Sequence, residues 1–264
     1  MDNIENESPL RYPGGKARAC NVIMEVIEAR TDLRQFTHLI SPFFGGGSFE
    51  FHFQNKYKVP VKANDKFHPL YIFWNAARYK NAQLCDTIEE LRPVTEQEFQ
   101  QYRASILEVE VPVTKAAYYF IVNRCSFSGF TLSGAFSPEA SKERFTQTSI
   151  GRIRDLDLRL VDFSCQDCND FINSNANSTS LIFLDPPYYL GNASTLYGAD
   201  CDLHEPFDHQ RLFNTLKLKE NWVLCYNDCE YVKELYEGYD IVEVDWKCGM
   251  DGSGQLPGLL VLNL

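Results

Sequence analysis

Residues 181–189 read LIFLDPPYY and place two prolines directly after a run of apolar residues. The apolar run predicts a buried strand over residues 180–185. Each proline holds φ at about −65° and lacks an N–H donor, and the residue before a proline is driven to extended geometry. The strand therefore ends in a stiff bend that directs Asp185 and the carbonyl groups of Pro186 and Pro187 outwards.

This bend is rich in hydrogen-bond acceptors and poor in donors, so it suits a substrate that presents an NH2 group. An exocyclic amine on an aromatic base is a poor nucleophile because its lone pair is delocalised into the ring. Two acceptors that hold its hydrogens favour a pyramidal nitrogen, whose lone pair can attack the methyl carbon of a sulfonium. We therefore predict a catalytic site at Asp185, Pro186, Pro187 and Tyr188, with Tyr188 lying against a planar ring.

Strands alternate with helices on both sides of this motif. Further strands are expected at residues 37–44, 59–65, 158–164, 222–228, 240–246 and 258–264. This alternation predicts an α/β sheet with parallel pairing. The alternation stops between residues 80 and 160, where helical spacing prevails, and we interpret that stretch as an inserted module.

Two strand ends carry features of a cofactor site. Gly45-Gly46-Gly47 follow the strand at 37–44 and would let a ligand approach the backbone, although three glycines alone more often mark a tight turn. The strand at 59–65 ends in Asn64-Asp65, and an acid there can accept hydrogen bonds from the ribose of an adenosine cofactor. No phosphate-binding motif accompanies them, so S-adenosylmethionine, which has a ribose but no pyrophosphate, fits best.

The charge of the chain is unevenly distributed. The 264 residues carry a net charge of −11, which as a whole argues against a nucleic-acid partner. Residues 113–160 nevertheless hold seven Lys/Arg against four Asp/Glu, whereas residues 161–264 hold five against seventeen. The excess positive charge lies at Lys142, Arg144, Arg152, Arg154 and Arg159. Composition alone supports equally a solvated surface and a DNA-facing surface.

Other classes of protein are not expected. No run of 18 apolar residues is present, so no membrane span is predicted. The start MDNIENESPL is acidic and lacks an apolar segment, which argues against secretion. The nine cysteines then predict reduced thiols. No metal site is predicted, because Cys225 lies in the middle of an expected strand and should pack in the core.

Four motifs together resemble one known family. They are PLRYPGGK at residues 9–16, PFFGGGS at 42–48, Asn64-Asp65, and DPPY at 185–188. In this order they are similar to the motifs of the Dam-type (D12 class, α-group) DNA adenine-N6 methyltransferases, over nearly the whole chain. The chain departs from the family pattern at Ser41, where glutamate is usual, and at Cys168, where phenylalanine is common.

The resemblance implies a doubly wound, Rossmann-like methyltransferase sheet with an inserted, mainly helical target-recognition module. The catalytic domain would comprise residues 1–79 and 161–264, and the module residues 80–160. The methyl donor would be S-adenosylmethionine, and the flipped adenine would be held by Asp185, Pro187 and Tyr188. The cofactor would be bound by Tyr12, Lys16, Phe43, Gly45, Gly46, Gly47, Asp65, Asp167 and Asp185.

The partner implied by the resemblance is double-stranded DNA. We expect the module to face it through Arg124 and Phe127, placed in a Ser/Gly-rich loop, and through Lys142, Arg144 and Arg152. Arginine can read guanine edges or bind phosphate. The sequence pattern of GATC-specific members is absent from the module, so no recognition sequence is predicted.

Two other functions remain open. The chain could methylate another planar amine, in RNA adenine or protein glutamine, or it could be a catalytically inactive DNA-binding relative. PLRYPGGK and Asp185 favour the DNA enzyme over the first, and intact Asp65, Asp185 and Tyr188 favour it over the second. We further expect a monomer or weak homodimer in the cytoplasm (or in the host nucleus or cytoplasm if viral), with a cognate restriction endonuclease as a candidate partner.

Overall fold

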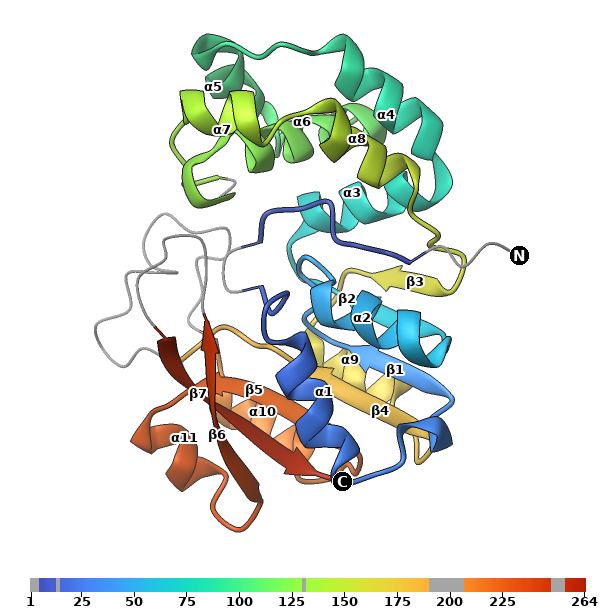
Figure 1. Ribbon diagram of the computed structural model, residues 1–264, viewed down its shortest axis with the longest axis vertical. Helices are drawn as coiled ribbons and strands as arrows, with labels where there is room; N and C mark the ends of the chain where they lie inside the picture. Colours follow the sequence, from blue (N-terminus) through green and yellow to red (C-terminus); the bar gives the residue numbers. More distant parts are fainter. Residues whose placement is uncertain (1–4, 13–14, 130–131, 190–206, 248–254) are drawn as a thin grey trace.

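Figure 1 shows the protein as a computed structural model that describes residues 5–12, 15–129, 132–189, 207–247 and 255–264. Within these ranges the strands form one seven-stranded sheet in the order β3-β2-β1-β4-β5-β7-β6. Their bounds are β1 His38–Ser41, β2 Val61–Asn64, β3 Val161–Ser164, β4 Ser180–Leu184, β5 Trp222–Asn227, β6 Asp240–Lys247 and β7 Gln255–Asn263. The predicted α/β class is confirmed.

The order of the strands determines where a ligand can enter. The chain runs outwards from β1 to β2 and β3, and then returns to form β4 on the other side of β1. Strands β1 and β4 are parallel neighbours, with Leu39 opposite Leu181. In open α/β sheets, ligands bind in the crevice outside the carboxyl ends of the strands where the order reverses. This rule places the expected ligand site, which we call the crevice between β1 and β4, at the carboxyl ends of these two strands.

The last two strands, β6 and β7, do not pair in the parallel manner that was predicted. Strand β7 lies between β5 and β6 and is antiparallel to both. Only residues 248–254 separate Lys247, the end of β6, from Gln255, the start of β7. A parallel crossover needs a dozen or more residues, so this connection allows only antiparallel pairing.

Helices cover both faces of the sheet (Figure 1). Helices α1 (Cys20–Glu28) and α2 (Ser48–Tyr57) cover one face, and α9 (Cys168–Asn175), α10 (His209–Leu216) and α11 (Glu230–Leu235) cover the other. All five residues of β4 are buried. Its alternate residues belong to the two opposite hydrophobic clusters, Leu181 and Phe183 to the first and Ile182 and Leu184 to the second.

Between β2 and β3 the described chain is helical. The helices are α3 His68–Tyr79, α4 Asn81–Glu90, α5 Glu96–Ser105, α6 Pro112–Cys125, α7 Pro138–Glu143 and α8 Gln147–Arg154. Helix α5 begins with a capping box, in which Thr95 accepts from the backbone N–H of Glu98 and the Glu98 side chain accepts from the backbone N–H of Thr95. In the described ranges no helix is both long and apolar enough to cross a membrane.

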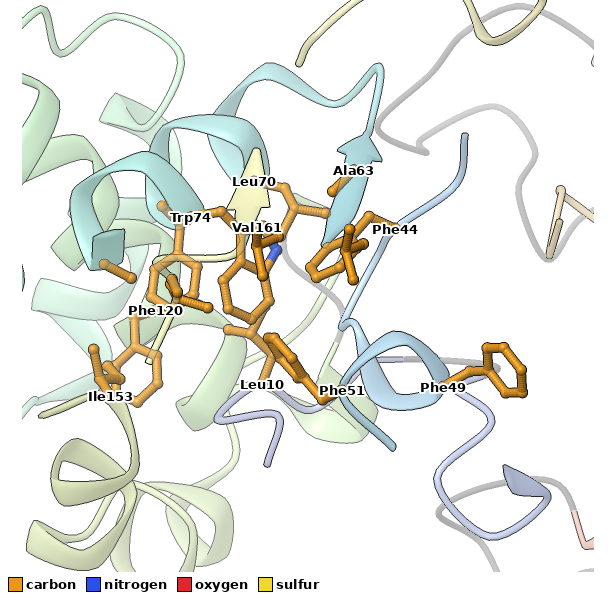
Figure 2. Packing of buried hydrophobic residues seen from close by; sticks show 14 of the residues in the cluster. Leu10, Phe44, Phe49, Phe51, Ala63, Leu70, Trp74, Phe120, Ile153 and Val161 are labelled. Atoms are coloured by element: carbon orange, nitrogen blue, oxygen red, sulfur yellow. The ribbon is translucent and has the colours of Figure 1, made fainter. Parts of the chain in front are cut away.

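These helices, which we call the helical layer, share a hydrophobic cluster with the sheet. Figure 2 shows Trp74, Phe120 and Ile153 from the helical layer in one cluster with Phe44 and Phe51. The rings of Phe73 on α3 and Phe120 on α6 are stacked with centroids 5.8 Å apart. Helix α3 therefore packs against α6 as part of the helical layer, although it precedes residue 80, the predicted start of the module. That boundary stays a prediction.

The N-terminal segment connects the helical layer to the sheet (Figure 1). The backbone N–H of Arg11 donates to Asn123 Oδ1 on α6 over 2.9 Å, and Asn6 Nδ2 donates to the carbonyl of Asp157 over 2.8 Å. Residues 13–14 of the PLRYPGGK motif lie outside the described residues, but Lys16 beyond them is described. The segment thus leads from the helical layer to the carboxyl edge of the sheet.

Candidate active site

The carboxyl ends of four strands meet at one edge of the sheet. Asn64, the last residue of β2, holds three of the following loops together. Its Nδ2 donates to the carbonyl of Pro42 after β1 and to that of Gln166 after β3, both over 3.1 Å. Its Oδ1 accepts from the Gln166 N–H over 3.0 Å. Because Asn64 is 1% exposed, these bonds form without competition from water.

Asp185, the first residue after β4, is paired with Lys16. The Nζ atom of Lys16 lies 2.7 Å from both carboxylate oxygens. The side chains are 5% exposed for Lys16 and 22% exposed for Asp185. The sequence places the two residues together only through the family resemblance, and the structure brings them into direct contact.

Burial and the attraction between the two groups act in opposite directions on the pKa values of this pair. Burial lowers the pKa of Lys16, but the neighbouring Asp185 carboxylate outweighs this effect and raises it above its usual range. Burial raises the pKa of Asp185 above its usual range, and Lys16 opposes that rise. A carboxylate has about four lone-pair positions on its two oxygens. Asp185 can therefore accept further hydrogen bonds beside the one ammonium group.

Tyr188 lies beside this pair, and both Tyr188 and Asn227 carry a polar atom that has no partner among the described residues. The Lys16 ammonium lies 5.0 Å from the centroid of the Tyr188 ring. Within the described part of the chain, the Tyr188 hydroxyl and Asn227 Oδ1 are buried without a hydrogen-bond partner. Leaving a buried polar group unpaired typically costs about 1–3 kcal/mol. Both atoms can therefore gain a partner when a polar ligand binds.

The glycine loop after β1 is shaped by Tyr12. A Cβ atom at Gly45 would lie 2.7 Å from Tyr12 Cε1, and one at Gly46 would lie 2.9 Å from Tyr12 Cβ. Gly45 also has a φ of +49°, and Gly47 has a φ of +69°. The close approach that requires glycine here is made by Tyr12. A similar approach by a cofactor stays a prediction.

Asp65 and Phe43 lie beside the glycine loop. Asp65 Oδ2 accepts from the Gly45 N–H, and its Oδ1 accepts from the Phe67 N–H, both over 3.0 Å. Phe43 is partly buried against the second hydrophobic cluster, with its ring 5.5 Å from that of Phe207. Asp65 therefore supports the loop as well as standing at the end of β2, where a ribose-binding acid was predicted.

Asp167 follows β3 and caps helix α9. Its Oδ1 accepts from the backbone N–H groups of Asn169 and Asp170, and its Oδ2 accepts from Arg211 over 3.0 Å. Burial acts to raise the pKa of Asp167, but these amide bonds and Arg211 lower it overall. The carboxylate is therefore ionised at the edge where the adenine of a cofactor was predicted.

This geometry agrees with a comparison with known families. The family model of the D12 class N6 adenine-specific DNA methyltransferases matches residues 12–250, most of the chain. The chain belongs to this family. Its activity is the methylation of adenine N6 in DNA, and the family implies a methyl donor. No individual curated protein matches the chain.

One residue of this D12-class methyltransferase lies where it was not expected. Arg124 was predicted in a loop that reads DNA, but it lies on helix α6 and is 8% exposed. Its Nε donates to the Arg144 carbonyl over 2.7 Å and its Nη1 to the Pro9 carbonyl over 3.1 Å. The loop placement is wrong because α6 continues through Cys125. In this structure Arg124 joins the N-terminal segment to the helical layer.

The other residues predicted to bind DNA are exposed. Phe127 is 64% exposed in a short 3-10 turn, and Lys142, Arg144 and Arg152 are exposed on or beside α7 and α8. Arg154 and Arg159, by contrast, form ion pairs with neighbouring acids. Arg152 forms a longer ion pair, with Glu7 at 4.0 Å. The structure therefore separates balanced arginines from those that retain excess positive charge.

Arg11 and Glu50 lie near the residues predicted to bind DNA and cofactor, but the sequence did not single them out. Repulsion from Arg11, Arg152 and Arg144, added to the larger effect of burial, lowers the pKa of Arg124 to about 10. The four guanidinium groups therefore lie close together. Arg11 belongs to PLRYPGGK, but its position beside α6 is set by folding alone. Glu50 carries no motif signal at all.

Neither the metal-ligating residue types nor the cysteines form a site among the described residues. Among the side chains that it describes, no group of three or more His, Cys, Asp or Glu is arranged to hold a metal ion. The seven described cysteines are free thiols. The interpretation of Cys225 as a core residue is confirmed, because it is fully buried in β5.

Proposed function

We propose that this D12-class methyltransferase transfers a methyl group from S-adenosylmethionine to an adenine flipped out of double-stranded DNA. The observation that carries the proposal is the buried Lys16–Asp185 pair at the crevice between β1 and β4. We retain the Dam-type α-group assignment as part of the proposal. It rests on the order of the motifs, with the glycine loop before DPPY and a helical segment between them.

The residues at the carboxyl edge fit the proposed cofactor. Asp65 and Asp167 offer carboxylates at the ends of β2 and β3, suited to the ribose hydroxyls and to the adenine amino group. The glycine loop and Asp185 flank the crevice beside them. When bound there, S-adenosylmethionine supplies a methyl carbon attached to a positively charged sulfur.

The protein's own groups would orient the acceptor amine. Asp185 and the carbonyl groups of Pro186 and Pro187 would accept hydrogen bonds from the amine, and Tyr188 would stack on the adenine ring. As the new N–C bond forms and the C–S bond breaks, the nitrogen loses one proton to water. Asp185 therefore acts by orienting the amine and by electrostatic stabilisation.

The target adenine cannot reach this site inside a duplex. It must be extruded, at a cost of a few kcal/mol. Stacking on an aromatic side chain is worth about 1–3 kcal/mol per base. Tyr188 would offset part of the extrusion cost through this stacking.

The first experiment tests the reaction and its substrate class together. Protein is incubated with S-adenosylmethionine labelled in the methyl group and with duplex DNA of mixed sequence, structured RNA or a protein extract. We expect label on adenine N6 in duplex DNA, confined to one short sequence context. Label in RNA or protein, with none in DNA, would contradict the proposal.

We propose that the helical layer recognises the DNA through its unbalanced arginines. Arg144→Ala and Arg152→Ala are each expected to weaken DNA binding. Loss of a phosphate contact would reduce the slope of log K against log[salt] by about 0.9. Loss of a base contact would instead cost about 1–3 kcal/mol at one position of the site. Titrations at several salt concentrations distinguish these outcomes.

Two control variants match this experiment. Arg154→Ala removes an arginine that is already paired with Asp86 and Glu89. Glu234→Gln changes an exposed acid on α11, on the opposite side of the sheet. Both should leave DNA binding nearly unchanged. If Arg144→Ala and Arg152→Ala behave like these controls, the helical layer is not the DNA-facing element.

The remaining expectations stay predictions. They are a monomer or weak homodimer, a cytoplasmic location (or the host nucleus or cytoplasm if viral), and a cognate restriction endonuclease. The extents of the catalytic domain (1–79 and 161–264) and of the target-recognition module (80–160) are predictions as well.

A further inference from the structure

A buried glutamate lies beside the proposed cofactor site and has no role in the reaction as described above. Glu50 is in the first turn of α2, directly after the glycine loop, and is 3% exposed. The hydroxyl of Ser41, the last residue of β1, donates to Glu50 Oε1 over 2.6 Å. Ser41 is itself fully buried, next to the strand that ends at Asp185. The carboxyl group thus lies at the carboxyl end of β1, near enough to Lys16 and Asp185 to feel their charges.

Several titratable groups face Glu50 from the surrounding elements. They are Lys16 before α1, Cys20 on α1, Asp185 after β4 and Cys225 on β5. The thiol of Cys20 donates to the Lys16 carbonyl over 3.2 Å. Burial raises the pKa of both thiols, so both stay neutral near pH 7. Lys16 and Asp185 carry opposite charges that cancel.

Glu50 is therefore the group that sets the net charge of the cluster. Burial raises its pKa to about 8, although the Ser41 hydrogen bond lowers it. In the free protein, burial therefore favours the protonated, uncharged form of Glu50. The start of α2 and the Ser41 hydroxyl nevertheless favour the ionised form, so ionisation needs only a nearby positive charge.

The proposed ligand brings such a charge. S-adenosylmethionine carries a sulfonium, an ammonium and a carboxylate, so it enters with a net charge of +1. A desolvated cation is unfavourable without a counter-charge, and the charge of Asp185 is already matched by Lys16. We propose that Glu50 is the counter-ion for the cationic methyl donor, releasing its proton to solvent on binding and remaining as a carboxylate held by Ser41.

This inference rests on the proposed cofactor, and its test uses two ligands that differ in charge. S-adenosylhomocysteine lacks the methyl group and the sulfonium charge but keeps the same amino and carboxyl groups. Isothermal titration calorimetry at pH 7 in buffers of different ionisation enthalpy measures the protons released by each ligand. We expect release of close to one proton with S-adenosylmethionine and markedly less with S-adenosylhomocysteine.

Variants assign the proton to Glu50. Glu50→Gln keeps an acceptor for Ser41 but cannot ionise, so the difference in proton release between the two ligands should vanish. Wild-type affinity for S-adenosylmethionine should rise by up to about tenfold per pH unit below the pKa of Glu50 and level off above it, whereas Glu50→Gln should show no such rise. Glu25→Gln, an exposed change on α1, is the matched control and should behave as the wild type.

A second variant keeps the inference testable if Glu50→Gln folds poorly. Ser41→Ala removes the hydrogen bond that favours ionised Glu50. The pH above which the affinity for S-adenosylmethionine stops rising should therefore be higher in this variant. Equal proton release with both ligands, or unchanged release in Glu50→Gln, would overturn the role of Glu50 while leaving the cofactor in place. Failure of the wild type to bind S-adenosylmethionine at all would overturn the cofactor assignment and this inference with it.

Discussion

Replacing Asp185 with alanine is expected to slow methyl transfer to DNA by at least about 10²-fold, the scale of losing one preorganised polar group. Asp185 is the acceptor proposed to hold the amine, and Lys16 at 2.7 Å fixes its orientation. DNA affinity should persist, because the exposed arginines of the helical layer are untouched. Single-turnover rates with saturating donor and duplex measure the first effect, and a DNA titration measures the second.

A double variant separates the effect of Asp185→Ala on protein stability from its effect on catalysis. Asp185→Ala leaves the Lys16 ammonium buried without its partner, and breaking a buried pair in this way typically costs about 3–5 kcal/mol. Combining Asp185→Ala with Lys16→Met removes both charges and should recover much of that stability, but not the activity. If either protein turns over at nearly the wild-type rate, DPPY serves only as a turn here.

Lys16→Met alone is expected to change how activity depends on pH. Asp185 is a stronger acceptor for the amine when it is ionised, and Lys16 is the group that opposes the rise in its pKa on burial. Without Lys16 that pKa rises further, so the acidic limb of the rate profile should move to higher pH. Rates measured from pH 5 to 9 test this, with Lys80→Met, an exposed lysine beyond α3, as the control.

The stability of Lys16→Met should have the opposite pH dependence. A carboxyl whose pKa is raised by folding contributes stability that is complete below its unfolded pKa, about 3.9, and that is lost as pH rises through the folded value. The variant should therefore unfold more easily as pH increases, while its activity improves. Denaturant unfolding across the same pH range measures this. A variant whose activity and stability keep the wild-type dependence on pH would show that Lys16 does not control Asp185.

The bend at the end of β4 could be predicted because local sequence determines it. Two consecutive prolines restrict φ and remove N–H donors wherever they occur, so the bend after β4 and its acceptors follow from residues 185–188 alone. The capping box of Thr95 and Glu98 is local in the same way, because both residues lie at the first turn of α5. Strands β1, β4 and β5 could be predicted from their runs of apolar residues alone.

Long-range contacts were less predictable. Arg124 and Phe127 are close in sequence, yet the first is buried on α6 and the second is 64% exposed. Composition treats Arg144 and Arg154 alike, but only Arg154 has acids of α4 within ion-pair distance. Whether an arginine is free to meet DNA depends on which helices pack beside it, and the charge of a segment does not contain that information.

By itself, the sequence determined the α/β class, the order of the motifs and the acceptors of DPPY, because these depend on residue type and on neighbours along the chain. Only the tertiary structure decided that Lys16 meets Asp185 across 169 positions of sequence and that Ser41 holds Glu50. It also decided the antiparallel placement of β7. The physical reason is that charge state and hydrogen bonding depend on desolvation and on the partners brought within about 3 Å. Both arise only when distant segments pack around the same edge of the sheet.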